Sequence, residues 1–229
     1  MCGRFTLTLN IDEIEDVFDL DQSMIQWIPS FNIAPSQMVP IFSQNEPGKI
    51  KLVKWGIHKT FNPSTPPRFL INIRKETLFD KHSFDSLLKG KRCLIPANGF
   101  YEWKRDELKS KSSMPYYFTT KSHSPFAFAG LWDDNNIGTE DDRAEFAIIT
   151  CAANEIVSQV HSRMPVILDH MEQKMWLSKD GKKDLIELLQ PYENRKMECY
   201  TVAPQVNNPS YNSLECIRPF SSLKQNSFL

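Results

Sequence analysis

The chain has 229 residues, of which 41% are hydrophobic and 24% charged, and its formal net charge at pH 7 is −1. This length suits one ordinary domain or two small ones, and the apolar fraction is enough for a buried core. No run approaches the roughly 18 uninterrupted apolar residues of a membrane span, and the first residues lack the apolar block of a signal peptide. Neither a membrane protein nor a secreted precursor is therefore expected.

Charge is distributed unevenly along the chain. Residues 1–48 carry one basic and seven acidic side chains, residues 49–121 carry sixteen and six, and residues 122–229 carry ten and fifteen. The central excess of positive charge predicts a basic face, and nucleic acid is the usual partner of such a face. The alternative is that these cations are scattered over the surface, because neighbours in sequence need not be neighbours in space.

The cysteines give no sign of a metal site. They are odd in number and widely spaced, and neither C-x-x-C nor H-x-x-x-H occurs; their positions are Cys2, Cys93, Cys151, Cys199 and Cys216. This pattern predicts neither a zinc site nor a disulfide framework, so we expect a cytoplasmic protein without a metal or an organic cofactor. The apolar surroundings of Cys93, Cys151 and Cys199 are typical of inert core thiols.

The first predicted element is a helix that begins after Asn10. Glu13 stands at the position of a capping box, and Ile11, Ile14, Val17 and Phe18 fall on one helical face. Short β-like runs then dominate, at residues 38–44, 49–56, 92–103, 115–120, 125–132 and 145–153, with a hairpin turn in "NEPGK" at 45–49. Further helices are predicted at residues 76–90 with a break near Ser83, at 154–160, at 170–178 behind an Asp169 cap, and at 182–190.

Many short strands with few long helices predict an α+β fold. We expect a single domain over residues 1–229, built around a curved, barrel-like antiparallel sheet with peripheral helices. Residues 61–72, with three prolines, are a predicted stiff and irregular loop. Residues 104–114 are a predicted polar loop of the kind that lies on the surface and can contact a ligand.

The second residue carries the most specific chemistry. Met1 is usually removed when the next side chain is small, and its removal would leave Cys2 with a free α-amine and a thiol on adjacent carbons. Such a 1,2-aminothiol condenses with an aldehyde to a five-membered thiazolidine. A thiol pKa near 8.5 and an α-amine pKa near 8 would leave both nucleophiles partly deprotonated at neutral pH. The alternative is that a cysteine follows Met1 by accident.

Several polar residues are embedded in apolar motifs. Glu102 lies between Tyr101 and Trp103 in a predicted strand, where burial would be costly and would raise the pKa of the carboxyl. Alternation along the strand would equally allow Glu102 to face solvent. Taken alone, His161 is typical of a hydrogen-bonded structural histidine, and asparagines such as Asn72 are typical of turns and caps.

Together these motifs resemble a known family. The series "MCGRF", "NIAPSQ", "WGI", "N-x-R-x-E", "IPANGFYEW", "FAFAGLW", "ITCAAN", "HSRMPVIL" and "VNN" is similar, in this order and over residues 2 to about 219, to the SOS-response-associated peptidase family of abasic-site-processing proteins. Ile73 departs from the family pattern, in which a small residue follows the asparagine, but Asn72 and Arg74 are in place.

The resemblance implies a function. It implies a protein that binds single-stranded DNA and links Cys2 covalently to the aldehyde of an abasic site, as a lyase-type enzyme of DNA repair that acts as a monomer. The implied catalytic residues are Cys2, Asn72, Glu102 and His161, and the implied DNA-binding residues are Arg4, Asn32, Arg74 and Arg163. Trp55 and the loop "STPPRF" at 64–69 are candidates for stacking on bases.

Two other functions stay open. A free N-terminal cysteine is also the nucleophile of N-terminal-nucleophile hydrolases, which would make the protein a peptidase or amidohydrolase that removes its own Met1. The third possibility is a DNA-binding module without covalent chemistry.

Overall fold

The computed structural model describes residues 2–80, 82–105, 113–134, 143–178 and 180–220. Its first sheet has five antiparallel strands in the order β15 (Met197–Thr201), β10 (Ser113–Thr120), β9 (Gly99–Arg105), β1 (Phe5–Leu7) and β2 (Ser30–Ile33). The second sheet has eight strands, and its main path runs β13 (Arg163–Pro165), β12 (Glu145–Ala152), β4 (Glu46–Trp55), β3 (Met38–Ser43), β8 (Arg92–Ala97), β11 (Phe126–Asp133) and β14 (Ile167–Leu168).

The second sheet closes on itself. Strand β11 pairs with β12 as well as with β8, so β12, β4, β3, β8 and β11 form a ring. Strand β7 (Asn72–Arg74) adds to β12, and both β7 and β4 run parallel to it, whereas the other pairs are antiparallel. A separate hairpin of β5 (Ile57–Lys59) and β6 (Arg68–Leu70) leads into β7. The predicted barrel-like α+β fold is therefore confirmed, apart from its two parallel pairs.

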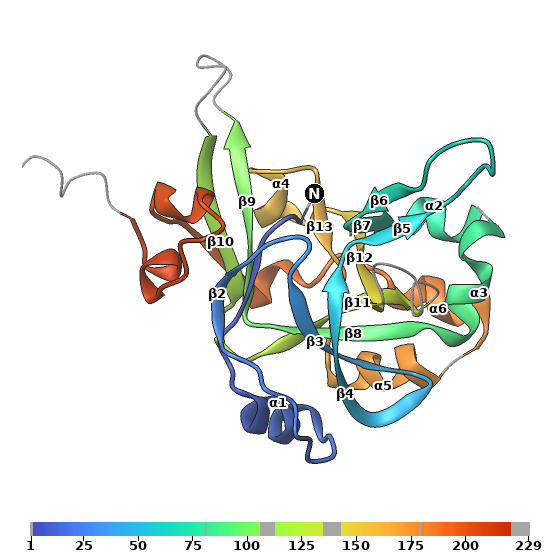
Figure 1. Cartoon of the computed structure of the whole chain (residues 1–229). Helices are drawn as coiled ribbons and strands as arrows, with labels where there is room; N and C mark the ends of the chain where they lie inside the picture. The colour runs from blue at the N-terminus through green and yellow to red at the C-terminus, as the bar shows by residue number, and fades with distance from the viewer. Residues whose placement is uncertain (1, 81, 106–112, 135–142, 179, 221–229) are drawn as a thin grey trace, which may run out of the picture.

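The helices lie at the periphery (Figure 1). They are α1 (Ile11–Phe18), α2 (Lys75–Asp80), α3 (Asp85–Gly90), α4 (Glu155–Ser158), α5 (His170–Ser178) and α6 (Lys182–Leu188), with short 3-10 turns at His82–Phe84, Asn194–Lys196, Pro204–Asn207 and Leu214–Ile217. None of the described helices is long and apolar enough to cross a membrane.

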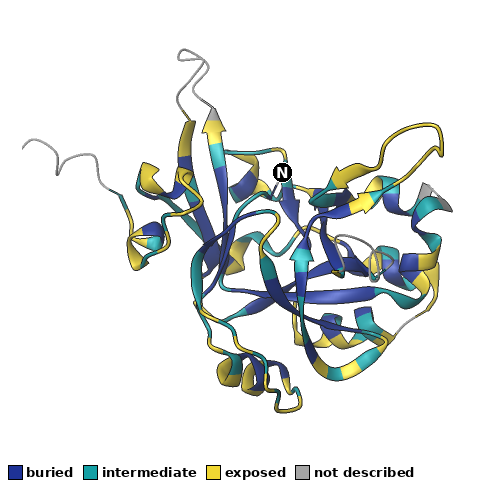
Figure 2. Ribbon diagram, viewed as in Figure 1, coloured by how far each residue is buried: buried dark blue, intermediate teal, exposed yellow. Residues whose placement is uncertain are grey.

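An aromatic cluster joins the two sheets. The Phe5 ring, from the five-stranded sheet, lies 5.0 Å from Trp55 and 5.6 Å from Phe128, which belong to the ring of strands. Phe100, the register partner of Phe5, reaches Phe128 at 6.3 Å. These side chains are fully buried, and Figure 2 shows the strands as the buried part of the molecule. Because Phe5 is fixed on two sides, the residues just before it are held in place as well.

The first helix is confirmed in detail, with one difference. Asn10 and Glu13 form the reciprocal capping box, with hydrogen bonds of 2.7 and 2.9 Å. Ile14 and Phe18 are buried, but Val17 is 45% exposed, because the helix packs on a narrower stripe than its sequence pattern predicts.

Four predicted boundaries were wrong. Residues 104–105 and 113–114 of the predicted polar loop belong to β9 and β10, and residues 106–112 of that loop lie outside the described residues. The run at 92–103 is broken at Asn98 into β8 and β9, which belong to different sheets. Asn98 accepts a hydrogen bond from the Thr8 backbone N–H at 2.7 Å, so the break is held by a side chain. The hairpin turn lies at Gln44 and Asn45, so it begins one residue before the predicted turn at 45–49. The rest of the predicted turn, including Gly48 (φ 77°), belongs to β4. Residues 68–70 of the predicted proline-rich loop form β6.

Candidate active site

The first strand pair brings Cys2 to Glu102. Phe5 pairs with Phe100, and the Tyr101 N–H donates to the Arg4 carbonyl at 2.9 Å. Extending this antiparallel register by two residues places Glu102 opposite Gly3, beside Cys2. Figure 1 shows the start of the chain between β9 and β7, in agreement with the interactions of Cys2 with Glu102 and Asn72.

Asn72 approaches Cys2 from the other sheet. Its Nδ2 donates to the Cys2 carbonyl at 2.8 Å, across 70 positions of sequence. Its Oδ1 is buried and has no hydrogen-bond partner among the described residues. An amide that holds Cys2 with one atom and keeps a buried acceptor unused is arranged to receive a donor from a ligand.

Burial controls the protonation of this site. Glu102 is 3% exposed, and this burial raises the pKa of its carboxyl from 4.5 to about 7. Of the two alternatives for Glu102, a buried carboxyl or a solvent-facing one, the structure has the buried carboxyl. A carboxyl with a pKa near 7 populates both its acid and its base forms at neutral pH, which is what proton transfer requires.

The thiol differs from the expectation. Cys2 is 0% exposed, and burial raises the pKa of its thiol well above the ordinary value, with a further contribution from the negative charge of Glu102. Burial therefore opposes ionisation of the Cys2 thiol, which the sequence does not show; ionisation of Cys2 after removal of Met1 stays a prediction. The Sγ atom lies 3.9 Å from the Arg4 carbonyl oxygen, to which a protonated thiol can donate.

His161 lies in the turn between α4 and β13. Its backbone N–H donates to the Val157 carbonyl at 2.9 Å. With the ring proton on Nε2, its Nδ1 accepts from the Arg163 backbone N–H at 3.0 Å. This turn lies at the same end of the molecule as the start of the chain (Figure 1). A direct contact between the ring and Cys2 stays a prediction.

The predicted DNA-binding arginines differ in availability. Arg74 is exposed at the end of β7, two residues after Asn72. Arg163 is instead paired with Glu76, through Nη1–Oε1 and Nη2–Oε2 distances of 2.7 and 2.8 Å, and its Nη2 also donates to the Thr150 carbonyl. The end of its guanidinium is thus occupied, which leaves Nε–H and the second Nη1–H as donors for a phosphate.

Asn32 and Arg4 have a structural role that the sequence did not reveal. Asn32 is 1% exposed and its amide is bonded within the protein, so a contact of Asn32 with DNA stays a prediction. Its Nδ2 lies within hydrogen-bond distance of the carbonyls of Val206, Asn208 and Tyr211, so one of its two hydrogens is shared, and its Oδ1 accepts from Arg4 Nη1 at 2.7 Å. Arg4 Nη1 also donates to the Val206 carbonyl. The two residues clamp the C-terminal segment against β1 and β2.

Trp55 is buried as well. It is 0% exposed, and its Nε1 donates to the Ile71 carbonyl at 2.9 Å. Trp55 therefore belongs to the core, where it supports the turn from β6 to β7. In the other candidate, the loop at 64–69, the rings of Phe69 and of its neighbour Phe61 are 43% and 38% exposed, so this loop stays a prediction.

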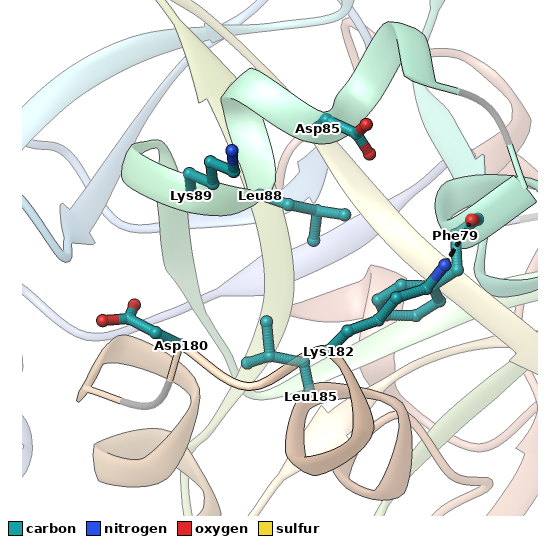
Figure 3. A pocket seen from close by; sticks show the side chains of 7 residues that line it. All are labelled: Phe79, Asp85, Leu88, Lys89, Asp180, Lys182 and Leu185. Carbon is teal, nitrogen blue, oxygen red and sulfur yellow. Dashed lines mark hydrogen bonds between the residues drawn. The ribbon is translucent and has the colours of Figure 1, made fainter.

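A cavity of about 580 Å³ lies elsewhere, between α2, α3 and α6 (Figure 3). Leu88 and Leu185 face each other across it, and charged side chains stand at its rim; the full lining is Phe79, Asp85, Leu88, Lys89, Asp180, Lys182 and Leu185. None of the predicted site residues lines this cavity. The chemistry is therefore assigned to the surroundings of Cys2, not to this cavity.

The geometry defines a class of protein: an α+β protein in which two sheets enclose a cysteine, a carboxyl group of raised pKa and an asparagine. Comparison with known proteins identifies the family. A family model described as SOS response associated peptidase (SRAP) matches residues 1–209. The chain belongs to this family.

Several relatives cover nearly the whole chain. The chain is 40% identical over 223 residues to abasic site processing protein YoqW of Bacillus subtilis. The aligned region covers 95% of this chain and 99% of that protein. Abasic site processing protein HMCES of Xenopus tropicalis is 27% identical, covering 95% of this chain and 78% of that protein. Among solved structures, a protein from Bacteroides thetaiotaomicron has a TM-score of 0.79 at 22% identity, covering 96% and 100% of the two chains. Its likeness confirms the fold.

Proposed function

We propose that the chain processes abasic sites by binding single-stranded DNA and linking Cys2 covalently to the aldehyde of the lesion, once Met1 has been removed. The observation that carries this proposal is the gathering of Cys2, Asn72 and a Glu102 whose pKa is about 7. The names of the relatives, which describe abasic site processing, support it.

The proposed reaction has two bond-forming steps. The Cys2 α-amine attacks C1′ of the opened deoxyribose, the carbonyl oxygen leaves as water, and an imine forms. The sulfur then adds to the carbon of the protonated imine as the thiol gives up its proton to a neighbouring base, and a thiazolidine closes. The nitrogen keeps the proton that it took up when the imine formed. One aldehyde and one aminothiol thus give one ring and one water. Ring closure consumes the imine, which would otherwise promote β-elimination and scission of the strand.

The neighbouring residues divide the remaining work. Glu102 transfers protons during sugar opening and imine formation, because both of its protonation states are populated near neutral pH. Asn72 orients Cys2 through the carbonyl contact and offers its unused Oδ1 to the amine or to a sugar hydroxyl. His161 is assigned to the hydroxyl released when the sugar opens, and it offers Nε2–H when Nδ1 accepts from Arg163.

Single-stranded DNA is the proposed partner because of what surrounds the site. Arg74 is exposed two residues from Asn72, and exposed arginines bind phosphates well. Two hairpins, β5–β6 and β9–β10, project from the end of the molecule at which the chain starts (Figure 1). They carry the exposed cations Arg68 and Lys104. A duplex would have to unpair before its sugar could reach a buried Cys2.

The test is a cross-linking assay on the full chain. Protein of verified intact mass, with Met1 removed, is mixed with labelled single-stranded DNA that carries a uracil-derived abasic site, and is then run on a denaturing gel. We expect a heat-resistant shifted band with the wild type and with Cys199→Ser, and its loss with Cys2→Ser, because oxygen closes the ring far less favourably. A stable band with Cys2→Ser would overturn the mechanism.

The peptidase alternative uses the same residue and is supported by the description of the family. In that reading Cys2 attacks an amide carbonyl and its own α-amine acts as the base. Hydrolysis of added peptides without any DNA adduct would favour it over the cross-linking proposal.

A further inference from the structure

One ion pair joins the two segments that carry Asn72 and His161. Both terminal nitrogens of Arg163 bind the two carboxylate oxygens of Glu76, at 2.7 and 2.8 Å. The Arg163 side chain is 14% exposed and that of Glu76 is 51% exposed. Hydrogen bonding to Arg163 lowers the pKa of Glu76. Such a fork-to-fork pair fixes orientation as well as distance.

The pair crosses over strand β12. Thr150, near the end of β12, pairs with Arg74 of β7 on one edge and with Pro165 of β13 on the other. Glu76 stands just after β7, and the Arg163 guanidinium spans to it from β13 while donating to the Thr150 carbonyl at 2.7 Å. The bridge therefore ties β7, β12 and β13 together at one level of the sheet.

Both ends of this bridge are close to proposed catalytic groups. Glu76 follows Asn72 by four residues, through β7 and the first residues of α2. Arg163 follows His161 by two residues, and its backbone N–H donates to the His161 ring at 3.0 Å. A change in the position of Arg163 is therefore passed directly to the imidazole.

We infer that Glu76 is a positioning residue of the reaction: by holding Arg163, it sets the His161 turn relative to Asn72 and directs the remaining N–H groups of Arg163 toward the sugar that reacts. This inference rests on the proposed function. Arg163 Nε is buried and has no hydrogen-bond partner among the described residues, so the arginine is held in place with a donor still unused. An oxygen of the lesion strand is the acceptor that the proposed function supplies.

The ion pair between Glu76 and Arg163 is expected to contribute little to the free energy of unfolding. Exposed ion pairs contribute at most about 1 kcal/mol, and Glu76 is half exposed. Small displacements of reacting groups, in contrast, cost large factors in rate. Loss of Glu76 should therefore appear in the rate of cross-linking more than in unfolding or in DNA affinity.

The alternative role for Glu76 is that of a competitor: its carboxylate would bind Arg163 until a DNA phosphate displaces it. The two roles predict opposite signs. Removing a competitor tightens DNA binding and speeds the reaction, whereas removing a positioning group slows the reaction at saturating DNA and leaves the half-saturating concentration almost unchanged.

The test compares Glu76→Ala, Glu76→Gln, Arg163→Ala and the double variant in single-turnover cross-linking over a range of DNA concentrations. We expect Glu76→Ala to lower the rate at saturating DNA about ten-fold and to change the half-saturating concentration less than about two-fold. Glu76→Gln, which keeps one acceptor, should recover part of the rate. The double variant should be no slower than Arg163→Ala, because the two side chains act as one unit.

The matched control is Glu46→Ala. It removes the same charge from another ion pair, Glu46 with Lys51 at 2.5 Å on β4, and we expect it to react like the wild type. An unchanged or faster reaction with Glu76→Ala would overturn the inference.

A second readout does not need the reaction. In the proton–carbon NMR spectrum of the histidine rings, with His161 assigned by a His161→Gln variant, we expect Glu76→Ala to shift the His161 signal and Glu46→Ala to leave it in place. An unmoved His161 signal would overturn the inference even in a protein that forms no cross-link. Failure of the proposed function alone would instead appear as a wild type without a DNA band.

Discussion

Replacing Glu102 with glutamine should make the protein more stable at alkaline pH and less active. Glu102 is 3% exposed, and its pKa is raised from 4.5 to about 7 by burial. The folded state therefore holds its proton more tightly than the unfolded state does, and stability falls as pH rises from about 4.5 through about 7. A pKa difference of this size corresponds to about 3 kcal/mol.

The measurement is urea unfolding of the wild type and of Glu102→Gln at pH 4.5 and pH 8.0. Glutamine resembles the protonated carboxyl and carries no charge to bury, so the variant lacks this pH-dependent loss. The stability difference, variant minus wild type, should be larger at pH 8.0 than at pH 4.5 by about 3 kcal/mol. In thermal unfolding this is about 6–12 °C for a domain of this size. For each protein, the free energy of unfolding at one pH is the control for its value at the other pH.

The same reasoning fixes the outcome that would refute it. An equal stability difference at both pH values would mean that the Glu102 carboxyl titrates normally, and the assignment of Glu102 as a neutral-pH acid and base would be lost with it. Cross-linking by Glu102→Gln should meanwhile fall by about a hundred-fold or more, although its fold is intact.

Two further substitutions test the framework of the site. Gly56→Ala should destabilise the protein by roughly 2–3 kcal/mol, because Gly56 has φ +121° and a Cβ there would stand 2.1 Å from the Phe69 ring. In the matched control Gly90→Ala, a Cβ meets nothing within 4 Å, and the urea midpoint should be unchanged or slightly raised. Asn32→Ala should cost about 3 kcal/mol and expose the C-terminal segment to limited proteolysis, because it removes the hydrogen bonds of Asn32 to three carbonyls of that segment and to Arg4. Asn62→Ala, which loses a local turn contact at an exposed position, should resist protease like the wild type.

The local elements were predictable because their signals are local. The Asn10 and Glu13 capping box lies within four residues of sequence, and the apolar runs at 115–120 and 125–132 became β10 and β11. Strand β1 was missed because three residues give no periodicity, and its place depends on Phe5 packing against Trp55 and Phe128. Such long-range packing leaves no pattern in the sequence.

The site shows the same division. The motifs around Cys2, Asn72 and Glu102 pointed to residues that the structure does bring together. Residue type alone could not separate Asn32 from Asn72, since both are asparagines in apolar motifs. One is a buried clamp on three carbonyls and the other holds Cys2, and only the fold distinguishes them. Glu76 could have been found from the spacing of "N-x-R-x-E", but its partner Arg163 lies 87 positions away.

The electrostatics of Cys2 and Glu102 argue for an order of events in the proposed reaction. In the resting protein the thiol is held protonated by burial and by the charge of Glu102, so sulfur is a poor first nucleophile. The amine must therefore react first, and the protonated imine that it forms places a positive charge beside both groups. That charge stabilises the Glu102 carboxylate and favours loss of the thiol proton, which removes both penalties at the step where sulfur closes the ring. Burial thus disfavours the charged forms of Cys2 and Glu102 in the resting site, and the positive charge of the iminium intermediate offsets this effect. For this reason Glu102→Gln should gain stability and lose activity together.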